Sequence, residues 1–270
     1  MRPSTRWRVS YFTRPAAATW SRRRPAVPET GRRRVTETGF RSIEQAFQQV
    51  RSSNLALTER LRVVADAART LRPDYALAVD RFAERLAGVR AGGSAPEVGQ
   101  ALPLFALPDH DGRLVTLESL LGRAPLVVVF HRGHWCPFCR LSLAGLAEIE
   151  EAARPAQMVA ISAELPRFGR SLRDECGAGF PFLTDMGAGY ALSLGLAVWI
   201  DEQLAALIAE AGWDIPLYQG GADWVLPIPT VFLLDERGFI RFRHIDPDYR
   251  RQLEPARLLA EIRALASPSP

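Results

Sequence analysis

The chain contains no lysine, and all 34 of its basic residues are arginine. Beside the abundant alanine and proline, this composition reflects a GC-rich coding sequence and predicts no specific nucleic-acid binding. No stretch of about 18 apolar residues occurs, so we expect no membrane insertion. A glycine-rich nucleotide-binding motif is also lacking, so we expect no bound cofactor and electrons delivered by thiol exchange.

Cysteine is scarce as well. The three cysteines are too few for a secreted disulfide framework, and their number is odd. Two of them, Cys136 and Cys139, form a tight C-x-x-C, a spacing used for redox chemistry or metal binding in a reducing compartment. We therefore expect a cytoplasmic location.

Charge is unevenly distributed along the chain. Residues 1–34 contain ten arginines and one acid, Glu29, whereas the remainder carries 24 basic and 29 acidic residues. Residues 1–36 lack helical or strand periodicity and are predicted to form a disordered basic tail. No apolar segment follows the arginines, which argues against a secretory signal. A transit peptide, a solvated extension and an over-long start are the interpretations left open.

Residues 37–93 are predicted to form a helical N-terminal extension. Apolar residues recur at helical spacing over 57–71 and again over 75–89. Thr58 is the expected cap of the first helix, and Pro73 marks the break between the two. Amphipathic faces of this kind need a partner surface, which is each other, the main domain or a second copy in a homodimer.

Residues 94–270 alternate between strand and helix patterns. Strands are expected at 125–131, 158–162, 180–183 and 230–234, with a hairpin partner at 239–244. Helices are expected near 137–152, 168–175, 188–194, 201–211 and 253–265. This alternation predicts an α/β domain whose mixed central sheet is flanked by helices.

The C-x-x-C lies where a buried strand leads into a helix. Pro137 suits the first helical position, which puts Cys136 at the positive end of the helix dipole, where a thiolate is favoured. Lowering a thiol pKa from about 8.5 to about 7 takes roughly 2 kcal/mol. Cys139 shares a face with Leu143 and Leu146, so we expect an exposed attacking thiolate at Cys136 and a more buried resolving thiol at Cys139.

Two other interpretations of the C-x-x-C are a zinc site and a structural disulfide. Zinc needs four ligands, and the sequence has no second C-x-x-C, C-x-x-H or H-x-x-x-H, so no metal is expected. Ile228 and Pro229 open a late strand about 90 residues further on. In that context a thioredoxin fold uses a cis-proline beside its reactive cysteines, a trans proline being the alternative.

From about residue 96 onward, the chain resembles the peroxiredoxin-like branch of the alkyl hydroperoxide reductase/thiol-specific antioxidant (AhpC/TSA) family. The segments that carry the resemblance are 99–109, 111–112, Leu117, 127–139, 161–166, 180–185 and 230–238. The resemblance implies a thioredoxin fold and thiol-dependent reduction of hydroperoxides. It also implies that a cysteine sulfenic acid forms, that a second thiol condenses with it, and that a thioredoxin-like reductant regenerates the site.

The chain departs from this family at three positions. Typical members place Thr three residues and Pro seven residues before the reactive cysteine, where this chain has Gly133 and Val129. The family's Arg at the start of the late strand is replaced by Pro229. Arg132, His134 and the pair Arg241 and Arg243 are candidates to substitute for these groups.

Other residues near the C-x-x-C have candidate supporting roles. His134 is expected either to support the thiolate or to be inert, and Trp135 to shield the site. Arg132 is expected either to attract polar substrates or to be solvated. Cys176 is interpreted as a small buried hydrophobe or as an extra resolving thiol. The segment holding Trp213, Tyr218 and Trp224 is expected to cover the sheet or to roof the site.

Three functions are consistent with these residues. The first is a thiol peroxidase in which Cys136 reacts with a hydroperoxide and Cys139 resolves it. The second is a general thiol–disulfide oxidoreductase acting on protein disulfides, which the C-x-x-C and the missing Thr and Arg favour. The third is a non-catalytic redox sensor that uses the tail and the helical extension as contact surfaces.

Overall fold

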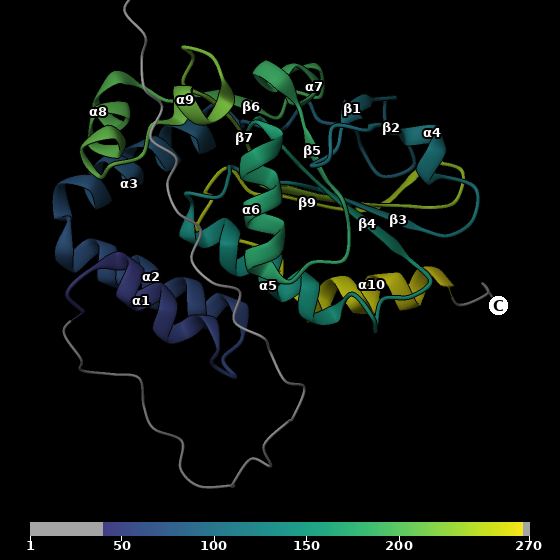
Figure 1. Cartoon of the computed structure of the whole chain (residues 1–270), viewed down its shortest axis with the longest axis horizontal. Coiled ribbons are helices and arrows are strands. Elements are labelled where there is room, and N and C mark those ends of the chain that lie inside the picture. The colour runs from purple at the N-terminus through teal and green to yellow at the C-terminus, as the bar shows by residue number, and fades with distance from the viewer. Residues whose placement is uncertain (1–39, 267–270) are drawn as a thin grey trace, which may run out of the picture. The chain divides into compact units, whose positions relative to one another are not determined.

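A five-stranded mixed sheet lies at the centre of the structure, a computed structural model that describes residues 40–266 (Figure 1). Its strand order is β5-β4-β3-β8-β9. The strands are β3 (Leu126–Phe130), β4 (Gln157–Ser162), β5 (Phe182–Thr184), β8 (Thr230–Leu234) and β9 (Ile240–Ile245). Strands β3, β4 and β5 are parallel, whereas β8 and β9 run antiparallel to their neighbours. The predicted mixed sheet and α/β class are confirmed.

Strand β3 is buried along its whole length because both faces of the sheet are covered. Its alternate residues divide between two apolar clusters, with Val127 and Val129 on one side and Val128 and Phe130 on the other. The first face is covered by α5 (Pro137–Ile149), α6 (Pro166–Cys176) and α10 (Pro255–Ala266). The second is covered by the hairpin of β1 (Ala106–Pro108) and β2 (Leu114–Thr116), by α4 (Leu117–Leu120) and by α7 (Gly189–Ser193), which follows the short helix η1 (Met186–Ala188).

The long segment before β8 forms a second hairpin and two helices. Its elements are β6 (Ala197–Trp199), α8 (Glu202–Glu210), α9 (Ile215–Gln219) and β7 (Val225–Pro227). Strands β6 and β7 pair antiparallel, which closes the insert on itself. Like β1 and β2, these strands have three residues each, too few for a visible alternation of apolar and polar side chains.

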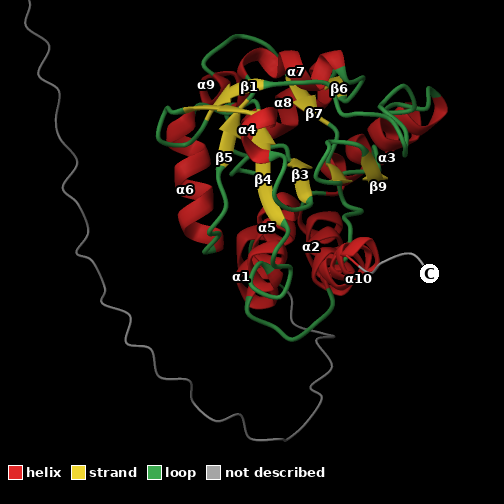
Figure 2. Cartoon of the chain, turned by 90° about the vertical axis from the view of Figure 1, so that its right-hand side faces the viewer, coloured by secondary structure: helices red, strands yellow, loops and turns green. Residues whose placement is uncertain are grey.

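The predicted helical extension is present as three helices. They are α1 (Ile43–Arg51), α2 (Leu57–Leu71) and α3 (Pro73–Gly88), with the break at Pro73 as predicted. Their apolar faces share one cluster with each other and with residues of α5 and α8, so within this chain they pack both on each other and on the main domain. Figure 2 shows α1 and α2 beside α5. No described helix, within 40–266, is long and apolar enough to cross a membrane.

Two local predictions about the backbone are wrong. Helix α2 is capped at Ala56 and not at Thr58, because the Glu254 carboxylate accepts the backbone N–H groups of Leu57 (3.1 Å) and Thr58 (2.6 Å). This tertiary contact satisfies donors that a local side chain would otherwise have to accept.

The second concerns Pro229, whose peptide bond with Ile228 is trans; among residues 40–266 the cis bond joins Arg154 and Pro155. The chain runs from β7 into β8 as one extended segment, in which Ile228 N–H donates to the Leu196 carbonyl at 2.7 Å. An extended residue before proline is compatible with the ordinary trans bond.

The predicted disordered tail, residues 1–36, lies outside the described residues. The described residues belong to one compact unit. The division of 37–270 into an extension and a thioredoxin-like domain stays a prediction.

Candidate active site

The C-x-x-C lies at the start of α5, directly after the loop that leaves β3. Cys136 is the N-cap residue of the helix and Pro137 its first residue, as the sequence predicts. Within this loop, Cys136 N–H donates to the Gly133 carbonyl at 3.2 Å. Cys139 lies one turn into the helix, and its sulfur accepts the Arg132 N–H at 3.4 Å.

Both sulfurs are buried, which contradicts the expectation of an exposed attacking thiol. Cys136 and Cys139 are each 1% exposed. The Cys136 side chain faces a cavity of about 10 Å³, at the lower limit of what holds one water molecule (about 10–15 Å³). Its other lining residues are Ile43, Ala68, Tyr75, Trp135, Pro137, Phe138, Trp213 and Tyr249. Helices α1, α2 and α3 therefore cover the thiol that the sequence alone places at the surface.

The two thiols differ strongly in acidity. Burial raises the pKa of the Cys136 thiol, but the Cys139 thiol hydrogen bond, the Arg132 guanidinium and the N–H groups of Cys139 and Phe138 lower it to about 7. Burial raises the pKa of Cys139 well above its ordinary value, and the neighbouring Cys136 raises it further. Cys136 is thus the thiol that ionises near neutral pH, whereas Cys139 stays protonated.

Arg132 is buried beside these thiols. The interpretation of Arg132 as a solvated side chain is therefore wrong. Its side chain packs against two aromatic rings, 3.7 Å from the ring centre of Tyr249 and 4.9 Å from that of Trp135. Both terminal nitrogens are buried without a hydrogen-bond partner among the described residues. A cation placed so near Cys136, in a region of little water, favours the thiolate strongly.

His134 is held by a buried carboxylate. Its ring Nδ1 lies 2.6 Å from Glu164 Oε1, and its backbone N–H donates to Glu164 Oε2 at 2.8 Å. Glu164 is 1% exposed, and burial raises its pKa. A Cβ at Gly133 would come within 2.5 Å of the same carboxylate, and the φ of +141° there also favours glycine. The missing threonine at position 133 therefore has a physical reason, since Glu164 fills its place.

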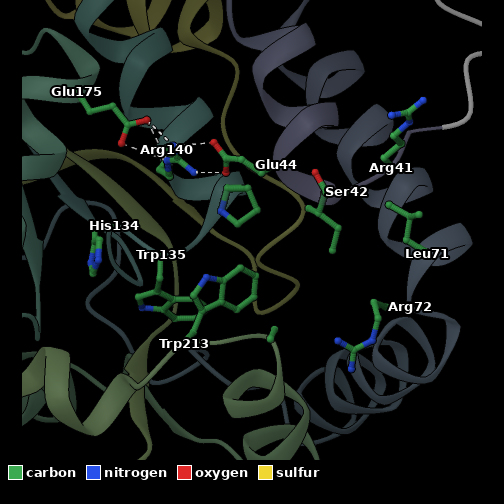
Figure 3. Close-up of a pocket in the computed structure, with 13 residues that line it drawn as sticks. Arg41, Ser42, Glu44, Leu71, Arg72, His134, Trp135, Arg140, Glu175 and Trp213 are labelled. Atoms are coloured by element: carbon green, nitrogen blue, oxygen red, sulfur yellow. Dashed lines mark hydrogen bonds and ion pairs between the residues drawn. The ribbon is translucent and has the colours of Figure 1, made fainter.

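An open groove of about 700 Å³ adjoins the thiol cavity. The two share Ile43, Trp135, Pro137 and Trp213, so these side chains form the wall between them. The rings of Trp135 and Trp213 are neighbours, with their centres 5.6 Å apart (Figure 3). Trp135 shields Cys136, and the segment before β8 roofs the site through Trp213.

Arg140 joins the helices that flank this groove. Its guanidinium pairs with Glu44 of α1 at 2.8 Å and with Glu175 of α6 at 2.6 Å (Figure 3). It also lies 3.9 Å from the ring centre of Phe47. This network links α1 to α5 and α6 at the edge of the groove.

Other candidates from the sequence lie outside the thiol cavity. Arg241 pairs with Asp235, and Arg243 with Glu97 and the carbonyls of Ala95 and Pro96, so neither substitutes for a group at Cys136. Cys176 bonds the Arg140 carbonyl through its sulfur at 3.6 Å, and burial raises its pKa to about 12. That environment is typical of a structural cysteine and favours the interpretation of Cys176 as a small buried hydrophobe over that of an extra resolving thiol. Ile228 is fully buried before β8.

No sequence motif indicates a role at the site for Tyr75, Tyr249 or Glu164. Tyr75 is one position of an apolar helical face, and Glu164 lies in a segment that carries the family resemblance. Tyr249 follows β9 with no motif around it. Their contacts with the site depend on chain segments that are distant in sequence, so no local pattern indicates them.

The donors of the described residues suit thiol chemistry. Within 40–266, no three His, Cys, Asp or Glu side chains gather as ligands for a metal ion. What the geometry does provide is one thiolate, one neutral thiol within hydrogen-bond reach and a buried cation. This arrangement supports nucleophilic attack by Cys136 and disulfide formation with Cys139.

Known proteins are similar to this chain in sequence and in fold. The thiol:disulfide interchange protein DsbE homolog of Paracoccus denitrificans is 28% identical over 177 residues, covering 64% of this chain and 78% of the relative. Thiol:disulfide interchange protein DsbE of Pseudomonas aeruginosa is 29% identical over 164 residues, covering 58% and 74%.

Solved structures show the same fold at low sequence identity. A peroxiredoxin-like protein from Aquifex aeolicus superposes with a TM-score of 0.51 at 13% identity, over 64% of this chain and 90% of that one. A variant of peroxiredoxin 6 of Arenicola marina gives 0.50 at 16% identity, over 63% and 74%. Residues 98–243 match the AhpC/TSA family, which is more than half of the 270 residues. The chain therefore belongs to the AhpC/TSA family and has its thioredoxin-like fold.

Proposed function

We propose that this redox enzyme is a thiol peroxidase that reduces small hydroperoxides at Cys136. The observation that carries the proposal is the position of Cys136: a thiolate, beside the buried Arg132, in a cavity of about 10 Å³. A hydrogen peroxide molecule enters such a pocket after a small movement of its wall. A protein disulfide reaches it only after the wall has opened.

The reaction proceeds in two steps that leave a disulfide. The Cys136 thiolate attacks the outer oxygen of the hydroperoxide, the O–O bond breaks, and the alcohol or water leaves with one proton. The resulting sulfenic acid then condenses with the Cys139 thiol, which forms the S–S bond and releases water. Cysteine is oxidised and peroxide reduced, with Arg132 stabilising negative charge in both steps.

Regeneration needs two electrons from outside the chain. A thioredoxin-like reductant in a reducing compartment, such as the cytoplasm, is the donor we propose, by thiol exchange at the Cys136–Cys139 disulfide. Because both sulfurs are buried, this step requires the wall formed by Ile43, Trp135 and Trp213 to open.

Stopped-flow oxidation tests the proposal. Reduced protein is mixed with hydrogen peroxide and followed through Trp135 fluorescence, with Cys136→Ser as the control. A rate constant orders of magnitude above that of a free thiol, lost in the variant, supports the peroxidase. A rate equal to that of an ordinary thiol rejects it.

The second candidate function is thiol–disulfide exchange with proteins. It is favoured by the two relatives whose names are thiol:disulfide interchange proteins, together with the C-x-x-C. Reduction of insulin by the dithiol form separates the two functions. Rapid insulin reduction together with slow peroxide oxidation favours exchange, and the opposite pair of results favours the peroxidase.

A further inference from the structure

Two buried tyrosines line the thiol cavity together with Cys136. Tyr75 belongs to α3, and Tyr249 lies between β9 and α10. They are 8% and 4% exposed, and their hydroxyl oxygens lie 3.1 Å apart. Two elements more than 170 residues apart in sequence thus bring a pair of phenols to the reactive thiol.

The pair has one hydrogen-bond donor that it cannot use internally. Each phenol carries a single proton, and one of the two is spent between the hydroxyls. Neither hydroxyl has another hydrogen-bond partner among the described residues. A buried donor without an acceptor is unfavourable, because it has lost its hydrogen bond to water and gained none in return. An acceptor in the cavity, where Cys136 reacts, satisfies it.

The surroundings keep these phenols protonated and polarised. Burial raises the pKa of Tyr75 and raises that of Tyr249 well above its ordinary value, so both are neutral donors at physiological pH. The Arg132 guanidinium lies 3.7 Å from the Tyr249 ring centre. A cation over the ring withdraws charge from the phenol and strengthens its O–H as a donor.

We propose that Tyr75 and Tyr249 are catalytic residues that donate a hydrogen bond to the hydroperoxide while Cys136 attacks it. This inference rests on the proposed peroxidase function. In the step, the thiolate electron pair forms the S–O bond and the O–O bond breaks. Negative charge then develops on the leaving oxygen, which accepts the phenol hydrogen bond and takes up one proton from solvent. The pair supplies a hydroxyl that position 133 cannot, because Glu164 occupies the space of a side chain there.

The tyrosines also show that the site extends beyond the segment that defines the family. The family match spans residues 98–243, and both tyrosines lie outside it. The helical extension therefore contributes a residue to the site, because Tyr75 of α3 lines the cavity.

The test measures the rate of Cys136 oxidation by hydrogen peroxide. Ultraviolet absorbance at the same pH gives the fraction of Cys136 that is thiolate. The rate divided by this fraction is the rate per thiolate. The variants are Tyr75→Phe, Tyr249→Phe and the double substitution, each of which removes an oxygen and little volume. Tyr190→Phe is the matched control, because the Tyr190 hydroxyl donates to the Pro103 carbonyl and Tyr190 does not line the cavity.

We expect the double variant to lose about 10- to 100-fold in rate per thiolate, the effect of one hydrogen bond to a charged oxygen in a buried site. The control should match the wild type, and each single variant should retain part of the rate because one hydroxyl remains. If the double variant does not fold, the two single variants provide the test, and each is expected to show a rate per thiolate below that of the wild type.

A wild-type rate per thiolate in the Tyr75 and Tyr249 variants overturns the inference while leaving the peroxidase intact. A wild-type protein that reacts no faster than a free thiol overturns the peroxidase itself, and this inference with it.

Discussion

At the scale of single residues, the chemistry depends on an opposite pair of charges in a nearly dry pocket. Arg132 is 3% exposed and Cys136 is 1% exposed, so their attraction is weakly screened by water. Cys139 adds a hydrogen bond from its protonated thiol. The low pKa of Cys136 thus comes from Arg132 and Cys139, whose effects exceed the rise in pKa that burial causes.

Replacing Arg132 by Met should raise the pKa of Cys136 from about 7 by about 1–2 units, because the cation that stabilises the thiolate is lost. A higher pKa means less thiolate at pH 7, so the rate–pH profile of oxidation should shift toward alkaline pH. Thiolate absorbance as a function of pH measures the midpoint directly.

The matched control for Arg132 is Arg243→Met. Arg243 is a half-buried arginine whose partners are Glu97 and two backbone carbonyls, remote from the thiols. Its variant should titrate like the wild type. An unchanged midpoint in Arg132→Met would show that the guanidinium does not govern the thiolate.

The sequence predicts some of these residues and not others. The spacing of Cys136 and Cys139 before a helix indicates both thiols and their order of acidity. It also indicates that Cys139 is buried, but not that Cys136 is, because the helices that cover Cys136 come from earlier in the chain. For the same reason an arginine in a loop looks solvated, and Glu164 looks like one more surface acid.

At the scale of elements, helix ends are fixed by tertiary contacts as well as by local caps. Helix α1 has a local cap, since the Ser42 side chain accepts the Gln45 N–H. In helix α2 the N-cap residue Ala56 has no side chain that can accept a hydrogen bond, although Glu59 accepts the Ala56 N–H at 3.3 Å. Glu254, just before α10, accepts the N–H groups of Leu57 and Thr58. A negative charge at this position also interacts favourably with the helix dipole.

Substituting Glu254 by Ala should lower the free energy of unfolding by about 1 kcal/mol, the usual value of a helix cap. Urea unfolding followed by circular dichroism measures the change. Thr58→Ala is the control and should change stability by less than about 0.5 kcal/mol. A larger loss for Thr58→Ala than for Glu254→Ala would contradict the tertiary cap.

Helices with a sustained period are predictable from the sequence, and the three-residue strands of the two hairpins are not. The periodicity of 57–71 and 75–89 is long enough to specify α2 and α3, and Pro73 separates them. Strands β1, β2, β6 and β7 have three residues each, and their hairpins are visible only once paired. The trans bond at Pro229 is also not indicated by the local sequence, in which an Ile-Pro-Thr context favours a cis-proline.

At the scale of the whole molecule, the thiol pocket is assembled from parts that lie both inside and outside the family segment. Residues 98–243 supply the thiols and Trp213, whereas Ile43, Ala68, Tyr75 and Tyr249 come from outside it. The sequence shows that the helices of 43–90 need a partner surface. Which surface they cover depends on the packed structure.

Trp213→Ala should open the wall between the outer groove and Cys136. In a Cys176→Ser background, the reaction of Cys136 with a bulky aromatic disulfide reagent should then accelerate by about 10-fold or more, because access limits a buried thiol. Trp199→Ala is the control, since Trp199 is 66% exposed on β6. Equal rates in the two variants would mean that Trp213 does not close the pocket.

The central claim is that a hydroperoxide reacts at Cys136, and trapping the product tests it most directly. In Cys139→Ser, the sulfenic acid at Cys136 has lost its resolving thiol and should persist. One equivalent of hydrogen peroxide followed by dimedone should give a single adduct, located at Cys136 by peptide mass spectrometry. No adduct at Cys136, or an adduct confined to Cys176, would contradict the account.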